Sequence, residues 1–249
     1  MSISATLHIM TKAADKAAAI VARDFGELEK LQVSRRGIKN FVTSSDRNSE
    51  SKIIYELSKA RPGFSFICEE SGLSKNENID SVWIVDPIDG TNNFMRGIPY
   101  FAINIALMEN KEFVAGVTLD PMRGDCFKAG LREGAFEGNR NRLRVSNREK
   151  LQEAVVALKI GFDIEQKFFN EGAIIRKTGS VALDLAYLAA GKYDVVIAKN
   201  VALWDIASGI VLIKESGGFI NYSKKDTGTY DVCAASSSKL LNIVSKIVE

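Results

Sequence analysis

Two carboxylates, Asp86 and Asp89, stand three residues apart directly after a short apolar run, Trp83-Ile84-Val85. Such a run is typical of a buried strand, and burying two like charges without a neutralising partner is costly. Pro87 lies between the acids and has no N–H, which leaves nearby carbonyl oxygens free to act as ligands. Gly90-Thr91 then offers backbone N–H groups at the start of a predicted helix, which suits a phosphate. The segment therefore predicts a cation site beside an anion site.

Two other places in the chain carry acids at the ends of predicted elements. Glu69-Glu70 follows the apolar run Phe64-Ser65-Phe66-Ile67, and Asp205 begins a predicted helix within Trp204-Asp205-Ile206-Ala207-Ser208-Gly209. Taken singly, each has an ordinary interpretation, a solvated surface pair or an acid in a first helical turn. Taken together with Asp86 and Asp89, they favour a site for a hard cation with oxygen ligands.

The first half of the chain reads as two helices followed by an antiparallel sheet. Apolar residues spaced by three, four and seven predict a long amphipathic helix over the first thirty residues. A second helix is predicted from Ser44-Ser45, which can cap it, to the break at Arg61-Pro62-Gly63. The strands are predicted in 64–67, 82–85 and 101–107, and a meander of short strands in 112–145.

From about residue 150 strands and helices alternate. Strands are expected in 154–158, 193–198, 219–222 and 232–235, and helices in 180–190, 204–216 and from 237 onward. We therefore predict a layered α/β protein with an N-terminal half, 1–150, that carries the metal motif. The C-terminal half, 151–249, carries Asp205. No linker rich in Pro, Gly or Ser separates them, so both are expected to form one continuous unit.

Composition excludes several other classes of protein. The formal net charge of +2 over 249 residues argues against a general electrostatic commitment to nucleic acid or to an anionic membrane. The three cysteines lack metal-ligand spacing and predict free thiols in a reducing compartment. No apolar run of about 18 residues is present, so no membrane span is expected. The sequence predicts a soluble, cytoplasmic protein.

The motifs resemble those of a known family. The stretch from Asp86 to Thr91, followed by Asn93-Phe94, resembles the first signature of the inositol monophosphatase family, and 204–209 is similar to its second signature. Glu69-Glu70 is similar to the acidic pair that precedes them. The resemblance implies the layered α/β/α/β/α sandwich of the inositol monophosphatase and fructose-1,6-bisphosphatase type. It also implies a homodimer and Mg²⁺-dependent hydrolysis of phosphate esters that Li⁺ inhibits.

The resemblance also assigns roles to individual residues. It implies two or three Mg²⁺ ions, with Asp86 bridging two of them, and a water oriented by Glu69 and Thr91 for in-line attack. The implied metal ligands are Glu69, Asp86, the Ile88 carbonyl, Asp89 and Asp205. The implied catalytic residues are Glu69, Thr91 and Asp89. The implied substrate-binding residues are Asp89, Gly90, Thr91, Ser180, Val181 and Asp205.

Two positions depart from the family pattern. Asn40 stands where the family usually has Asp, which affects lithium sensitivity and a third, weaker cation site. Ala198 stands where inositol-specific members carry a Glu that binds sugar hydroxyls, and Lys199-Asn200 follows it. Lys199 favours a substrate with a second anionic group, or is a solvated loop residue; both interpretations stay open. An inositol ring would lose one hydrogen-bond acceptor at this position.

Several functions remain compatible with these motifs. The expected reaction is hydrolysis of a small soluble phosphate ester similar to inositol monophosphate. Sugar, histidinol and nucleotide phosphates are alternatives on the same fold, although Asn92-Asn93-Phe94 favours the inositol-phosphatase branch. A second hypothesis is an RNA-binding or transcription-complex factor, suggested by the basic stretch Arg140 to Lys150. Alternation in 140–145 suits an edge strand with outward charges equally well.

Overall fold

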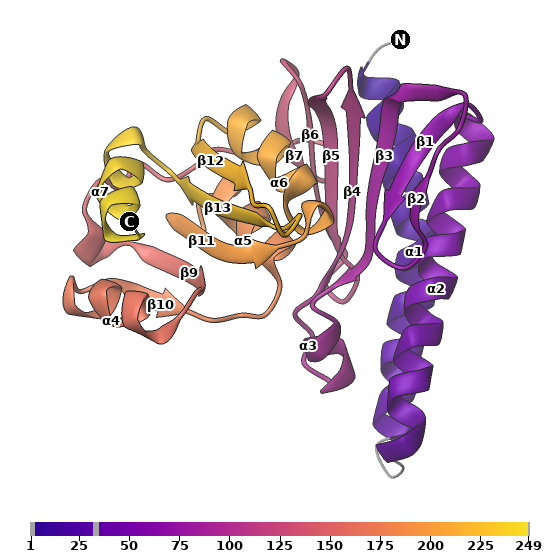
Figure 1. The fold of residues 1–249 in the computed structure, drawn as a ribbon, viewed down its shortest axis with the longest axis horizontal. Coiled ribbons are helices and arrows are strands. Elements are labelled where there is room, and N and C mark those ends of the chain that lie inside the picture. Colours follow the sequence, from indigo (N-terminus) through magenta and orange to yellow (C-terminus); the bar gives the residue numbers. More distant parts are fainter. Residues whose placement is uncertain (1–2, 32–34, 249) are drawn as a thin grey trace.

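Five layers follow one another across the molecule in the order helices, sheet, helices, sheet, helices (Figure 1). The computed structural model describes residues 3–31 and 35–248. Each sheet is covered by helices on both faces, as its buried apolar residues require. The α/β/α/β/α arrangement confirms the predicted fold class.

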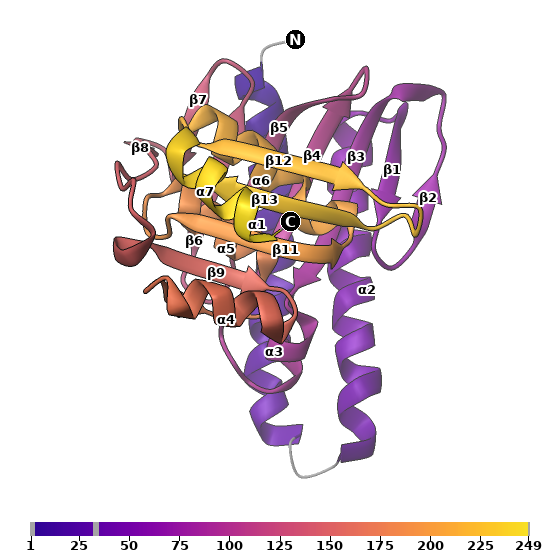
Figure 2. The same cartoon turned by 60° about the vertical axis from the view of Figure 1, so that its left-hand side comes forward.

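The first layer is a pair of long helices, α1 (Ile3–Leu31) and α2 (Arg35–Ala60), which lie side by side against the first sheet (Figures 1 and 2). The prediction of α1 is confirmed, and α2 ends before Pro62 as expected. Its predicted start near Ser44-Ser45 is wrong. Ser45 lies buried within the helix, and Ser49 Oγ donates a hydrogen bond to its carbonyl oxygen at 2.8 Å. Packing along α1 buries α2 upstream of the serines, as at Val42, so tertiary contact outweighs the local capping signal.

The first sheet contains eight strands in the order β2-β1-β3-β4-β5-β6-β7-β8. From β3 to β8 each strand is antiparallel to the next, which confirms the predicted meander, whereas β1 runs parallel to β3. The short helix α3 (Thr91–Met95) connects β3 to β4. The strands are β1 (Phe64–Cys68), β2 (Gly72–Ser74), β3 (Asn78–Asp89), β4 (Ala102–Glu109), β5 (Glu112–Asp120), β6 (Asp125–Gly130), β7 (Gly134–Glu137) and β8 (Asn141–Arg142).

The second sheet has five strands in the order β10-β9-β11-β13-β12. Its predicted strands and helices are confirmed within a few residues, but α4 and β10 were not predicted. The strand β10 has only three residues, whereas α4 has nine residues with an amphipathic spacing. The strands are β9 (Val155–Lys159), β10 (Ile174–Arg176), β11 (Val195–Val201), β12 (Phe219–Lys224) and β13 (Tyr230–Ala235). The helices are the 3₁₀ turn η1 (Leu151–Glu153), α4 (Phe162–Asn170), α5 (Val181–Ala189), α6 (Leu203–Glu215) and α7 (Ser238–Val248).

Helices α5 and α6 form the middle layer and contact both sheets. A Cβ on Gly116 of β5 would lie 2.7 Å from the Ser208 carbonyl oxygen of α6, so only glycine permits this close approach. A buried hydrogen bond between Thr118 Oγ1 and Ser208 Oγ, at 2.6 Å, also holds β5 and α6 together. The middle layer thus holds α6 at a fixed depth over the first sheet. Since it joins both sheets, the division of the chain at residue 150 stays a prediction.

Candidate active site

A bulge near the end of β3 brings two acidic side chains to the same side of the strand. Asp86 pairs with Asn104 of β4 and Asp89 pairs with Ala102, so three steps along β3 match two along β4. Residues three apart in a regular strand point to opposite faces, and one extra residue removes this difference. Pro87 lies inside the bulge, where the backbone forms no ladder hydrogen bond, so the lack of an N–H is tolerated.

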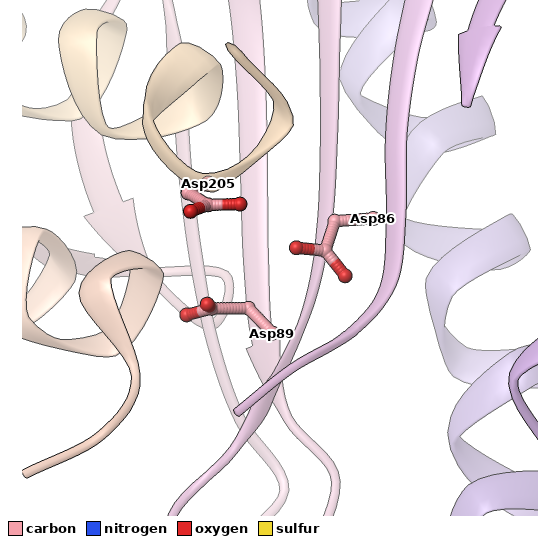
Figure 3. Close-up of side chains that lie close together, drawn as sticks. All are labelled: Asp86, Asp89 and Asp205. Carbon is pink, nitrogen blue, oxygen red and sulfur yellow. The ribbon is translucent and has the colours of Figure 1, made fainter. Parts of the chain in front are cut away.

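Asp205 completes a group of three carboxylates. It lies in the first turn of α6, and an oxygen from each of Asp86, Asp89 and Asp205 falls within 4.8 Å of the others. Figure 3 shows the three side chains turned toward one another between the strand and the helix. All three residues are buried. Segments that lie more than a hundred residues apart in the sequence therefore build one acidic cluster.

Each acid of the cluster is held by hydrogen bonds from nearby backbone or hydroxyl groups. Asp89 Oδ2 accepts hydrogen bonds from Ser180 Oγ at 2.5 Å and from Ala182 N at 2.7 Å. Asp86 Oδ1 accepts one from the Ile88 backbone N–H at 3.0 Å. These contacts fix the orientation of the carboxylates before any ligand arrives, which is a requirement of a metal site.

The contacts of Asp205 include a cation. Asp205 Oδ2 accepts a hydrogen bond from Ala202 N at 3.2 Å, and Lys159 Nζ, at the end of β9, lies 3.9 Å from the same oxygen. The separation from Lys159 is long and the lysine side chain is largely exposed, so this ion pair screens the cluster only weakly.

The protonation behaviour of the cluster follows from its burial. Burial is the largest cause that raises the pKa of Asp86, Asp89 and Asp205, and the mutual repulsion of the carboxylates raises the pKa of Asp86 and Asp89 further. The pKa of Asp89 reaches about 8. A divalent cation would remove this repulsion, and oxygen-only ligands are those that Mg²⁺ prefers. The residues therefore fit the hard cation that the sequence predicted.

Glu69 lies beside this cluster, but it is not among the three acids within 4.8 Å. A side-chain hydrogen bond joins it to Asp86, while burial raises its pKa. Within the described residues, its Oε2 is buried with no hydrogen-bond partner, as expected of an oxygen aimed at a cation. The loop that carries it is tied to α2, because Glu50 accepts hydrogen bonds from the N–H groups of Glu70 at 2.8 Å and Ser71 at 3.0 Å.

The predicted phosphate-binding residues lie at the same place. Thr91 Oγ1, which follows the bulge, donates a hydrogen bond to the carbonyl oxygen of Ile88 within the bulge at 3.1 Å. Gly90 has a φ of 103°, and a Cβ there would lie 3.1 Å from the Phe101 Cβ, so glycine is required at this turn. Ser180 caps α5 by accepting a hydrogen bond from Leu183 N at 3.3 Å.

A cavity of about 620 Å³ lies next to this cluster. Two of its lining residues contact the acids, Ser180 at Asp89 and Lys159 at Asp205. Its walls combine the loop before α5 with the ends of β9 and β11 and with α3. The lining includes Ser180 and Val181, both predicted to bind substrate. It also includes Lys159, Lys177, Lys199 and Asn200. Its volume is in the range of small-molecule sites.

Several residues of the site were assigned no role from the sequence, although 38–46 resembles a further element of the family. Asp46 of α2 is buried, its Oδ1 has no hydrogen-bond partner within the described residues, and its pKa rises to about 8 through burial and through the nearby Glu69 and Glu70. The available signal was the spacing from Asp46 to Ile53 and Leu57, which places an acid on the buried face of α2. Lys159, at the end of a predicted strand, had no signal beyond its position.

The positions that depart from the family pattern fall in different surroundings. Asn40 is exposed on α2. Ala198 is buried in β11 with 1% exposure, whereas Lys199 and Asn200 after it line the cavity. The Glu expected of inositol-specific members is therefore replaced by a side chain without polar atoms, and the next two residues supply the polar groups.

The basic stretch 140–150 lies away from the carboxylate cluster, around the edge strand β8. Arg140, Arg142 and Arg144 are exposed, while Leu143 between them is buried. This alternation agrees with an edge strand whose charges point outward. Among the described residues, no helix combines the length and apolar character needed to cross a bilayer.

Comparisons with known proteins cover nearly the whole chain. The inositol monophosphatase family matches residues 3–248. An inositol-1-monophosphatase of Caulobacter vibrioides is 42% identical over 243 residues, which are 92% of this chain and 93% of that protein. Nus factor SuhB of Escherichia coli K12 is 36% identical over 225 residues, 86% of this chain and 84% of its own length. The crystal structure of extragenic suppressor protein suhB from Bartonella henselae has a TM-score of 0.86 at 36% identity and covers 98% of this chain and 99% of that one.

Proposed function

Because the chain belongs to the inositol monophosphatase family, we propose that it is a Mg²⁺-dependent phosphomonoesterase acting on a small phosphate ester. The observation that carries this proposal is the convergence of Asp86, Asp89 and Asp205 within 4.8 Å beside a cavity of about 620 Å³. Burial raises the pKa of all three acids and repulsion raises that of Asp86 and Asp89 further, so a cation would stabilise their ionised forms, and the cavity has room for a substrate.

In this proposal the chain holds two or three Mg²⁺ ions through oxygen ligands. The ligands would be Glu69, Asp86, the Ile88 carbonyl, Asp89 and Asp205. When bound, the ions would supply a water of lowered pKa and would neutralise the charge that develops on the leaving oxygen. The hydrogen bonds from Ser180 and Ala182 would hold Asp89 in its ligating orientation.

The remaining roles belong to side chains and amides of the chain itself. Glu69 and the Thr91 hydroxyl would orient the attacking water, since Thr91 Oγ1 is already held by the Ile88 carbonyl oxygen at 3.1 Å. The N–H groups of Gly90 and Thr91 would hold phosphate oxygens, because the first amides of a helix lack intrahelical acceptors. Asp205 together with Ser180 and Val181 would contact the substrate.

The direct test is phosphate release from a panel of esters with and without Mg²⁺. The panel contains inositol 1-phosphate, fructose 1,6-bisphosphate, histidinol phosphate and 3′-phosphoadenosine 5′-phosphate. We expect turnover that requires Mg²⁺, and a loss of roughly 10³-fold or more in Asp89→Asn, several kcal/mol of transition-state stabilisation. The exposed Asp226→Asn serves as the matched control and should keep full activity. Equal activity in EDTA and Mg²⁺ would contradict the proposal.

A second candidate function is participation in a transcription complex. The Escherichia coli relative is named as a Nus factor, and this chain exposes Arg140, Arg142 and Arg144 at the edge of its first sheet. Such a cluster can contact phosphates of RNA. Reversing these three charges should abolish RNA binding while phosphatase activity stays intact, and Asp89→Asn should do the opposite. Unchanged RNA binding after the charge reversal would exclude this role for the stretch.

We further propose that the protein is a cytoplasmic homodimer that Li⁺ inhibits, as the family resemblance implies. Light scattering after size exclusion would give the mass, to be compared with 27.3 kDa for one chain. Titration of Li⁺ at fixed Mg²⁺ would test inhibition, and the Asn40→Asp variant would show whether this position weakens it.

A further inference from the structure

Three lysines from separate segments line the cavity beside the carboxylate cluster, and Lys199 also lines a second hollow next to α7. Lys159 ends β9, Lys177 lies in the loop before α5, and Lys199 lies near the end of β11. Of the described residues that line this cavity, only Asp184 is acidic. The cavity, which would receive the leaving group of the substrate, is therefore lined by more positive than negative side chains.

An irregularity in β11 helps to turn its end toward the cavity. The pairing with β13 shifts between Ala198 and Val201, so Lys199 and Asn200 fall in a bulge. Asn200 has a φ of 57°, in the left-handed region, and its N–H donates to Asp231 Oδ1 at 3.0 Å. Bulges of this kind change the direction of side chains at sheet rims. Both residues of the bulge line the cavity as a result.

The acidic neighbours neutralise these lysines unequally. Lys177 Nζ lies 2.8 Å from Glu165 Oε2 and is well paired. Lys199 Nζ donates to a backbone carbonyl oxygen, that of Val248, at 3.3 Å, and this acceptor carries no net charge. The carboxylate near Lys199, Asp231, is already paired with Lys225 at 3.0 Å. Among the described residues, no carboxylate forms a close ion pair with Lys199, and its side chain would have to turn away from Val248 to reach a ligand in the cavity.

Lys159 is also available for a ligand. Its partner, Asp205 at 3.9 Å, is one of the acids that fit a divalent cation, and a bound cation would compete for that carboxylate. Lys159 is in register with Ala198 on the neighbouring strand, where no acidic side chain can pair with it. Its side chain is 56% exposed and can reorient toward a ligand in the cavity.

Asp184 does not balance the lysines. It is buried, and it accepts hydrogen bonds from Tyr100 Oη at 2.8 Å and from Thr178 Oγ1 at 2.7 Å. These bonds direct its oxygens to the walls, where they fix the loop before α5. The lining also offers hydroxyl and amide groups, as at Ser180 and Asn200, so the lysines determine the net charge of the cavity and are not its only polar groups.

We propose that this cavity selects phosphate monoesters whose leaving group carries a second anionic group, a phosphate or a carboxylate, bound by Lys159 and Lys199. This inference rests on the proposed phosphatase function and specifies its substrate class. The hydrolysed phosphate occupies the carboxylate and metal side of the site, and the second anion lies on the lysine side. Both anions then meet positive charge without competing for the same groups.

The test compares related substrates with and without a second anion. Fructose 1-phosphate is paired with fructose 1,6-bisphosphate, and glycerol 2-phosphate with 2-phosphoglycerate, so that the first pair tests phosphate and the second tests carboxylate. We expect kcat/KM to be at least about tenfold higher for one doubly anionic member, the scale of a hydrogen bond between charged groups. The pair that responds identifies the anion.

Lysine variants connect this preference to the cavity. In Lys159→Gln and in Lys199→Gln the ratio of kcat/KM between the two members of the responsive pair should fall about tenfold, and further in the double variant. Lys150→Gln is the matched control, because Lys150 is an exposed lysine with a loose ion pair to Glu153 at 3.8 Å, away from the cavity. It should leave the ratio unchanged. Melting temperatures of all variants would verify that they are folded.

The outcomes separate this inference from the proposed function. Mg²⁺-dependent hydrolysis of all four esters with no preference for the second anion would overturn the inference and leave the phosphatase standing. A preference that persists in the double variant would also overturn it, because the lysines would not be its cause. Absence of hydrolysis from every ester, here and in the panel above, would overturn both.

Discussion

Replacing Asp89 by Asn should stabilise the metal-free protein even though it removes activity. Asn has nearly the same shape as Asp, and its Oδ1 can accept the hydrogen bonds from Ser180 Oγ and Ala182 N. What disappears is the free-energy cost of protonating this carboxyl on folding, because burial and the repulsion of Asp205 raise the pKa of Asp89 to about 8. The native state therefore holds this carboxylate less favourably than the unfolded chain does.

The magnitude follows from the pKa. One pKa unit corresponds to about 1.4 kcal/mol, so at pH 7 a group moved from its ordinary pKa of 3.8 to about 8 lowers the free energy of unfolding by roughly 4 kcal/mol. Burying the NH₂ of Asn costs about 1–2 kcal/mol, which leaves a net gain of about 2 kcal/mol. For a chain of this size the melting temperature should rise by about 4–8 °C in EDTA.

Mg²⁺ should reverse the order of the two proteins. The wild type gains stability from a ligand that binds only its folded form, about 2.7 kcal/mol at a hundred times the dissociation constant. Asp89→Asn lacks one ligand and should gain much less. The assay is thermal denaturation at pH 7 of both proteins, in EDTA and over a Mg²⁺ series.

Asp194→Asn is the matched control, because Asp194 is a buried acid outside the cluster. Asp194 Oδ2 accepts a hydrogen bond from Val155 N at 2.8 Å, and Arg148 lies 3.3 Å from its Oδ1. This variant should lose about 1–3 kcal/mol of stability in EDTA and should retain the full Mg²⁺ response. If Asp89→Asn were instead less stable than the wild type in EDTA, the cluster would not be a site of repulsion and the argument for a cation would fail.

Three further predictions concern the surroundings of the site. Gly116→Ala should lower stability by about 1–3 kcal/mol and reduce activity, because its Cβ would press on α6 at Ser208, near Asp205; chemical denaturation and phosphate release measure both. Asn93→Ala should cost about 1–3 kcal/mol, because Asn93 Nδ2 donates to two backbone carbonyl oxygens at 2.7 Å each, and an unchanged unfolding midpoint would count against this. The free energy of unfolding of the metal-free protein should fall as pH rises from about 4 to 8, because the raised pKa of Asp89 means that the native state binds more protons than the unfolded chain. Saturating Mg²⁺ should flatten this pH profile. A profile equally steep with and without Mg²⁺ would refute the assignment of Asp89 as a metal ligand.

The elements of the fold were largely predictable because their signals are local. The apolar spacing of α1, the alternation of β4 and the glycines that end α5 and α6 each report on a few neighbouring residues. The start of α2 was not predictable in this way. The start of α2 depends on contact with α1, and no local sequence pattern encodes how the two helices align. The three-residue β10 is too short to be distinguished from a loop, whereas the amphipathic spacing of α4 was a usable signal.

The acids of the site were predictable for a different reason. Asp86, Asp89 and Asp205 stand beside apolar runs and at element ends, where a charge has no structural need, so their types and flanks indicated a cation. Asp46 gave a weaker signal, since an acid on the inner face of a helix is visible only when the buried face is known. Lys159 and Lys177 looked like ordinary surface lysines.

The sequence by itself determined which residue types could do chemistry, the order of the layers and the membership of a family. Only the tertiary structure decided how those residues meet. The bulge at Pro87 places Asp86 and Asp89 on one side of β3, and the close contact of Gly116 with α6 sets the depth of Asp205. The physical reason is that side-chain types and periodicity are properties of the chain. The distance between two carboxylates depends on strand register and helix packing, which arise only when distant segments are buried together.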